Sequence, residues 1–163
     1  MRTEMKHKQE MHSMSNKHYG RLLLMIAVSF ASMYVLMYAM VDTFANVYSS
    51  FNQFYMAGLM TAPMAIIELV LMGAMYQNKK LNALIAAASL VALTGFWILI
   101  RQQAAISDEQ FLRSMIPHHA GAILMCEKAP LHDTEIKALC RGIISGQQSE
   151  IDLMKAKLSQ LDK

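Results

Sequence analysis

The side chains best suited to chemistry in this sequence of 163 residues are imidazoles, thioethers and thiols, and its last third holds both cysteines and a pair of adjacent histidines. Helical spacing of about 100° per residue over residues 111–128 places seven residues, five of them His, Met or Cys, within an arc of roughly 120°. These residues are Phe111, Met115, His118, His119, Ala122, Met125 and Cys126. Thioether and thiolate sulfur select soft cations, above all Cu(I), and imidazole also suits copper. One helix face therefore has the composition of a soft-metal site.

A second stripe with a helical period follows and carries polar residues where a plain bundle would carry leucine. Its members are His132, Ile136, Cys140, Ile143, Gln147, Glu150, Met154, Leu158 and Leu161. Folding the chain at residues 130–131 sets residues 115–119 opposite residues 143–150. Buried polar groups need partners, and a metal ion supplies them. We predict a site for Cu(I), which would also take Ag(I), with these ligands: Met115, His118, His119, Met125, Met154 and Cys126, with Gln147, Glu150 and His132 around them.

The same residues also have a purely structural interpretation. Met, Cys and a single His are common in helical cores. In that interpretation the His, Gln and Glu groups form a hydrogen-bonded core that specifies oligomerisation, and no metal binds. Other metals fit less well, because zinc seldom uses Met and a di-iron site would need Glu-x-x-His pairs, which are absent.

The two cysteines could be ligands, free thiols or a disulfide in an oxidising compartment. With the turn at residues 130–131, Cys140 lies opposite about residue 121, a full helical turn from Cys126. This register argues against a disulfide within one chain.

The elements that carry these side chains are expected to be helices, most of them in a membrane. Hydrophobic residues make up 55% of the chain and charged residues 17%, and the mean hydropathy is +0.26, which is too apolar for a small soluble domain. Residues 22–41, 54–76 and 81–100 each reach the roughly 20 apolar residues that a spanning helix needs. We therefore predict an all-α protein with a tail (1–20), a membrane region (21–101) and a helical hairpin (107–163).

Basic residues predict the orientation of these spans. The first 21 residues carry five Lys or Arg against two Glu, the loop 42–53 carries none, and the second turn carries Lys79 and Lys80. Basic loops stay in the cytoplasm, and three spans put the two ends of the chain on opposite sides. We therefore expect a bacterial inner-membrane protein with its hairpin in the periplasm. The net charge of +3 is too small to indicate a nucleic-acid partner.

Capping residues and prolines delimit the hairpin. Ser107 followed by Gln110 is a capping box, and the helical pattern runs to about Ala129 with a kink at Pro117. Pro130 breaks the pattern, and a second helix is predicted from His132 or Asp133 to about Leu161. Two helices of this size bury little apolar surface. We therefore expect a dimer that completes a four-helix bundle, or docking on the spans.

Two strings in the hairpin resemble a known family. Residues 115–125 read MIPHHAGAILM and residues 143–154 read IISGQQSEIDLM. They resemble the family called domain of unknown function 305, whose members carry M-x-x-H-H-x-x-A-I-x-M and then I-x-x-x-Q-x-x-E-I-x-x-M. The resemblance covers residues 107–160, about a third of the chain. It implies half of a ferritin-like four-helix bundle and, for some members, periplasmic copper binding in copper tolerance.

The resemblance also implies roles for single residues. The metal-side residues of the family fall on His118, His119, Met125 and Met154, and its core polar groups on Gln147 and Glu150. Larger members hold two such hairpins, so either two copies of this chain combine or the site is incomplete. Cys126 stands where small residues are common in the family, and three spans ahead of the hairpin are not part of the family pattern.

Two further groups are weighed against simpler explanations. The tail holds a Met/His-rich set that is either a soft-metal arm or a disordered basic segment: Met5, His7, Met11, His12, Met14 and His18. Glu68 is costly near mid-membrane and is expected to be protonated or bonded to Asn82 or Thr94. Together with the membrane methionines it could line a metal path in an oligomeric transporter, whereas those methionines alone suit helix packing.

The sequence thus predicts a membrane-anchored copper-binding protein that sequesters Cu(I) or hands it to periplasmic copper proteins. The alternatives are a metal-free interaction module and a subunit of an oligomeric metal transporter. No nucleophile–base pair, phosphate-binding loop or H-E-x-x-H motif occurs, so no enzymatic activity is expected.

Overall fold

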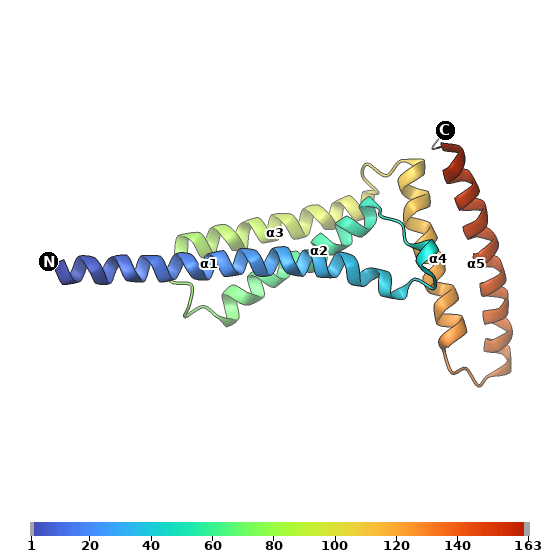
Figure 1. The fold of residues 1–163 in the computed structure, drawn as a ribbon, viewed down its shortest axis with the longest axis horizontal. Helices are drawn as coiled ribbons and strands as arrows, with labels where there is room; N and C mark the ends of the chain where they lie inside the picture. Colours follow the sequence, from blue (N-terminus) through green and yellow to red (C-terminus); the bar gives the residue numbers. More distant parts are fainter. Residues whose placement is uncertain (1, 162–163) are drawn as a thin grey trace. The chain divides into compact units, whose positions relative to one another are not determined.

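The computed structural model describes the backbone of residues 2–161 and the side chains of residues 17–161. Its elements are all helical, which confirms the predicted all-α class (Figure 1). They are α1 (Arg2–Leu36), the 3-10 helices η1 (Met37–Met40) and η2 (Phe44–Asn46), α2 (Phe51–Leu71), α3 (Lys79–Gln102), α4 (Asp108–Lys128) and α5 (Thr134–Leu161). The chain forms two compact units, one from residues up to 34 with 55–102, and one from residues 35–54 with 103–163.

Three helices are long and apolar enough to cross a membrane. They cover Lys17–Met40, Phe51–Leu71 and Lys79–Gln102, with 24, 21 and 24 residues. The second span starts and ends earlier than predicted, because residues 72–78 form the turn before α3. Helix α1 begins at Arg2, so the backbone of the basic tail is helical rather than disordered. The metal-arm hypothesis falls mainly on residues 1–16, whose side chains lie outside the described part.

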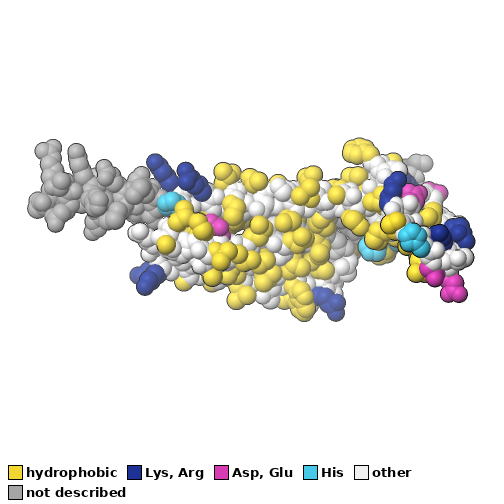
Figure 2. All heavy atoms as spheres, turned by 90° about the horizontal axis from the view of Figure 1, so that it is seen from below, with side chains coloured by type: hydrophobic (Ala, Val, Ile, Leu, Met, Phe, Trp, Pro, Cys, Tyr) yellow, Lys and Arg dark blue, Asp and Glu magenta, His cyan; other side chains and the backbone are white. Residues whose placement is uncertain are grey.

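The unit that contains these spans keeps most of its large apolar side chains on the outside. One small cluster of buried residues consists of Leu22, Leu69 and Tyr76, and no residue of α3 is buried. Figure 2 shows hydrophobic side chains over the surface of the long helices. Such a surface suits helices surrounded by lipid, where apolar side chains gain nothing by turning inward.

A cavity of about 370 Å³ lies among the three helices of this unit. Small residues such as Gly58, Ala62 and Ala92 line it, and the ring of Phe96 packs where a side chain at position 58 would stand. Neither a methionine nor Glu68 is among its lining residues. The space is therefore apolar and has no soft-metal ligand.

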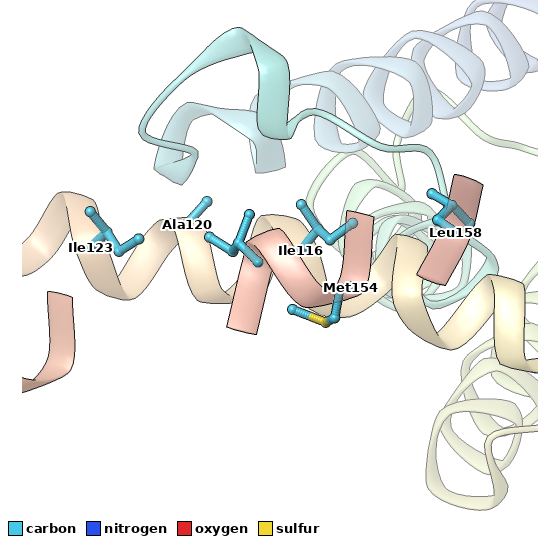
Figure 3. Close-up of a cluster of buried hydrophobic side chains, with 6 residues drawn as sticks. Ile116, Ala120, Ile123, Met154 and Leu158 are labelled. Carbon is cyan, nitrogen blue, oxygen red and sulfur yellow. The ribbon is translucent and has the colours of Figure 1, made fainter. Parts of the chain in front are cut away.

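The second unit buries its apolar side chains in the seam between α4 and α5. Figure 3 shows the cluster, with Ile123, Ala120 and Ile116 from α4 and Met154 and Leu158 from α5. Its members are Ile116, Ala120, Ile123, Ile151, Met154 and Leu158. Val41 and Tyr48 pack on this cluster from the connection between α1 and α2. The hairpin core is thus completed by residues 35–54, which the sequence analysis assigned to the end of the first span, the loop after it and the first residue of the second span.

This connection runs close to α4. The carbonyl oxygen of Met40 approaches Gly121 so closely that a Cβ there would lie 3.4 Å from it. The backbone N–H of Phe51, at the start of α2, donates to Gln110 Oε1 at 2.9 Å. Asn52 and Gln103 also exchange two side-chain amide hydrogen bonds, at 2.9 and 3.2 Å. Side chains at the start of the hairpin therefore hold the segment that precedes α2.

Capping explains where the two hairpin helices begin. Ser107 Oγ accepts from the N–H of Gln110 at 3.3 Å, which confirms the predicted N-cap. The Gln110 side chain does not return to Ser107, because it accepts from Phe51 instead. Asp133 Oδ1 accepts from the N–H groups of Glu135 and Ile136 and so starts α5. Helix α4 continues through Pro117 to Lys128, as predicted.

Candidate metal centre

His119 is the buried polar residue at the centre of the hairpin, with 9% of its surface exposed. Its Nδ1 lies 2.9 Å from the carbonyl oxygen of Met115, four residues earlier on α4. Its Nε2 lies 2.7 Å from Glu150 Oε2 on α5. The predicted meeting of the two helices at this level is therefore confirmed for His119 and Glu150.

These two contacts determine which nitrogen of His119 is open to a metal. A carbonyl oxygen can only accept, so Nδ1 carries a hydrogen and donates to Met115. The hydrogen bond at the other ring nitrogen then joins His119 Nε2 to Glu150 Oε2 through one shared proton. Histidine ligands of metals usually donate their other ring N–H to a carbonyl or carboxylate. Nε2, which faces Glu150 Oε2, is therefore the ring nitrogen of His119 that is not committed to the backbone.

Thioether sulfurs occupy the next level along the same seam. Met154 is buried, and Met115 packs against the same cluster. Met115 and His119 are one turn apart on α4, as are Glu150 and Met154 on α5, so the two levels are about 6 Å apart along the helices. One imidazole nitrogen and two thioethers therefore lie in one buried stretch of the hairpin.

Other predicted ligands lie outside this stretch. His118 is exposed, with its ring centroid 6.1 Å from that of His119. Met125 is 55% exposed, and His132 is exposed in the turn. Gln147 is half-buried. Among the described residues, no group of three or more His, Cys, Asp or Glu side chains forms a metal site, so any centre here depends on methionine sulfur.

The helical-wheel prediction misplaced the buried face of α4. The core stripe of this helix is Ile116, Ala120 and Ile123, rather than the stripe centred on His118, Ala122 and Met125. Helix α4 contacts both α5 and the connection that contains η1 and η2. Because two sides of the helix are covered, a single apolar arc could not locate the core.

Cys126 and Cys140 form a disulfide, which contradicts the prediction drawn from the register. Their Cα atoms are 5.3 Å apart, so the two residues lie directly opposite each other. The connection after α4 leaves the helix in an extended conformation at Ala129, and α5 starts only at Thr134. The hairpin is therefore centred near residue 133 rather than at 130–131. While this disulfide is closed, Cys126 has no thiolate to offer a metal.

Glu68 has a different partner from the two that were predicted. Its Oε1 accepts from the hydroxyl of Tyr76 at 3.1 Å. Asn82 instead accepts from Tyr19 at 2.6 Å and donates to the carbonyl oxygen of Tyr76 at 2.7 Å, and Thr94 bonds to its own helix at Leu90. Helix α2 ends at Leu71, so Glu68 lies one turn from its end rather than at mid-membrane.

Tyr76 and Tyr19 form a ring contact beside Glu68 that the sequence analysis did not predict. Tyr76 is in the turn after α2, and its ring centroid lies 5.3 Å from that of Tyr19. Burial raises the pKa of Tyr76, and the hydrogen bond and charge of Glu68 raise it further. The phenol therefore stays protonated as a donor to Glu68. The available signal was Tyr76 itself, a tyrosine at the end of the second predicted span, where aromatic residues are common.

Comparison with known proteins identifies the family. The family model described as "Domain of unknown function (DUF305)" matches residues 41–158, which is most of the chain. The chain belongs to the DUF305 family. The match begins ahead of α2 and includes α3, so the expectation that all three spans lie outside the DUF305 pattern is wrong.

One curated relative matches the sequence of this chain over most of its length. The chain is 32% identical over 142 residues to "Uncharacterized protein L153" of Acanthamoeba polyphaga mimivirus, covering 85% of this chain and 91% of that protein. No solved structure matches the chain.

Proposed function

We propose that this DUF305 protein is a membrane-anchored copper-binding protein whose hairpin holds Cu(I) for sequestration or handover in copper tolerance. The ligands proposed are His119 Nε2 and the sulfurs of Met115 and Met154. The observation that carries the proposal is the orientation of His119. Its Nδ1 donates to the Met115 carbonyl, which leaves Nε2 as the metal-binding atom beside two thioethers.

The chemistry of this donor set favours a soft monovalent cation. Thioethers are neutral and select Cu(I), or Ag(I), over harder divalent ions. An ion at Nε2 must displace the proton that His119 shares with Glu150, so binding releases a proton. The side chain of Glu150 is 58% exposed. It can therefore leave Nε2 towards solvent and still balance the charge of the ion.

The disulfide supports an extracytoplasmic hairpin. Disulfides persist in oxidising compartments and are rare in the cytosol, and the Cys126–Cys140 bond lies in this hairpin. The basic tail and second turn independently favour a cytoplasmic location for those segments. The proposed location is therefore the bacterial inner (plasma) membrane, with the N-terminus in the cytoplasm and the hairpin in the periplasm.

Partners follow from the surface of α5. Four large apolar side chains on this helix are exposed: Ile136, Leu139, Leu153 and Leu161. A second copy that completes a four-helix bundle would cover them. The proposed handover partners are periplasmic copper proteins.

Two other functions were considered for this protein. A metal-free interaction module is favoured by one observation, because both ring nitrogens of His119 already have hydrogen-bond partners. A transporter gains no such support, because the cavity among the membrane helices is lined by neither Glu68 nor methionine. No catalytic step is proposed.

The decisive experiment uses the full chain, purified in detergent with its disulfide intact, titrated with Cu(I) against a competing chelator. We expect tight binding of one ion per chain that is lost in His119→Ala and weakened at least tenfold in Met154→Leu. The matched controls are His118→Ala and Met125→Leu, which change an exposed His and an exposed Met on α4. These two variants should bind as the wild type does.

Two outcomes would contradict the proposal. Wild-type binding that survives in His119→Ala would move the site elsewhere, and the absence of binding by the wild type would favour the interaction module. The helix content of each variant, measured by circular dichroism, separates loss of a ligand from loss of the fold.

A further inference from the structure

The disulfide and the proposed metal site share one seam. Cys126 follows His119 by seven residues on α4, which is about 20° short of two full turns, so both lie on the same side of the helix. Cys140, Gln147 and Met154 repeat this seven-residue spacing on α5. The disulfide is therefore a third level of the seam, about 10 Å from His119 along the helix axis and next to the turn.

We propose that Cys126 and Cys140, once reduced, form a two-thiolate site for a soft monovalent cation at the turn end of this seam. The hairpin would then hold a second ion whose binding depends on the redox state of the cysteines. This inference rests on the proposed soft-metal function and assigns to it a second, redox-controlled site.

The geometry suits two thiolates that share one ion. Cys126 and Cys140 come from different helices and lie directly opposite each other, with Cα atoms 5.3 Å apart. Both are half-buried, so a reductant can reach them while solvent is partly excluded. Thiolates are the protein ligands that select Cu(I) most strongly. Two of them neutralise the charge of the ion and leave one negative charge on the complex.

The hairpin stays assembled when the disulfide opens. Ile116, Ile123 and Ile151 hold the two helices together further along the seam, and Val41 and Tyr48 pack on the same cluster. The two thiols would therefore remain opposite each other after reduction. The geometry of the two-thiolate site therefore depends on the packing of the cluster and not on the disulfide bond.

A dithiol reductant supplies the electrons and protons that opening of the disulfide requires. One thiolate of the reductant attacks a sulfur of the disulfide, the S–S bond breaks, and the second thiol of the reductant displaces the mixed disulfide. Two electrons and two protons pass to Cys126 and Cys140, and the reductant leaves as its own disulfide. A cation then forms bonds to both sulfurs and displaces the two thiol protons. Exchange in the opposite direction re-forms the disulfide and releases the ion.

The test counts metal ions on the full chain in detergent, with Ag(I) as the probe and a competing chelator present. One sample is kept oxidised, and one is reduced and freed of reductant without oxygen. We expect the reduced protein to bind one more ion per chain than the oxidised protein, with a thiolate-to-metal absorption band in the ultraviolet. Equal numbers of ions in the two samples would overturn the inference.

Two controls separate this site from the one at His119. Cys126→Ser/Cys140→Ser should bind the oxidised number of ions under both conditions, and alkylation of the reduced wild type should give the same number without any substitution. His119→Ala/Met154→Leu should gain one ion on reduction although it binds none when oxidised. A gain of one ion on reduction would support the cysteine site even if the oxidised wild-type protein binds no metal, so the two proposed sites are tested separately.

Discussion

The two units of this protein use apolar side chains in opposite ways. In the hairpin unit, Ile116 and Ile151 are fully buried in the seam between α4 and α5. In the membrane unit, Ile67, Leu84 and Val91 lie on the outside of their helices. Water drives apolar groups into the first core, whereas lipid is as apolar as leucine and exerts no such force. Hydropathy therefore locates the membrane helices, whereas the core of the hairpin depends on which faces of α4 are covered by α5 and by the connection with η1 and η2.

The largest effect should come from the same truncation made in both units. Ile116→Ala removes a fully buried side chain and should lower the free energy of unfolding by about 2–5 kcal/mol. Ile67→Ala changes a side chain on α2 that is 54% exposed and should cost less than about 0.5 kcal/mol. Denaturant unfolding of both variants in detergent measures the difference. Equal costs would mean that the two units are packed alike.

The disulfide should matter almost as much, and only in the hairpin. Cys126→Ala/Cys140→Ala opens a loop with a sequence separation of 14 residues and should lower stability by about 3 kcal/mol. Hydrogen exchange should become faster in α4 and α5 while α2 and α3 keep their rates. Faster exchange throughout the chain would show that the two units do not unfold separately.

Loss of the His119–Glu150 contact should have a smaller effect on stability and a clear effect on metal uptake. Glu150→Gln should cost about 1 kcal/mol, because the carboxyl group is more than half exposed and already screened by water. Cu(I) affinity of the wild type should rise with pH, since binding displaces the shared proton. The pH dependence should weaken in Glu150→Gln. Equal slopes for the two proteins would place the released proton elsewhere.

The hydrogen bond between Tyr76 and Glu68 in the membrane unit should contribute no more than the His119–Glu150 contact. Tyr76→Phe removes the donor to Glu68 and should lower the melting temperature by an amount that corresponds to about 1 kcal/mol. Because burial raises the pKa of Tyr76 in the folded state, its contribution is present below about pH 10 and is lost as the pH rises through that raised value. Thermal unfolding at pH 7 and above pH 10 measures both effects. A difference between wild type and variant that grows at high pH would contradict this assignment.

Most of the fold could be predicted because it depends on local signals. Runs of apolar residues identified the three long helices, and Ser107 and Pro130 marked the limits of α4 to within a few residues. These features depend on neighbours in the sequence, which a sequence shows directly.

The errors concern features that depend on distant contacts. The register that pairs Cys126 with Cys140 is set by the extended conformation at Ala129, and the proline gave only the position of the break. The buried face of α4 is decided by η1 and η2, which no periodicity within α4 reveals. The partner of Glu68 depends on how the turn after α2 brings Tyr76 back, a conformation that residue types alone do not specify.

Gln110 has a consequence for how this protein can be divided. Its side chain serves a backbone group 59 positions earlier, at the start of the second membrane helix, instead of its own helix end. An excised copy of residues 107–163 would lose that contact and the cover that Val41 and Tyr48 give to its core. The hairpin is therefore not a self-contained fragment, which agrees with a DUF305 match that starts at residue 41.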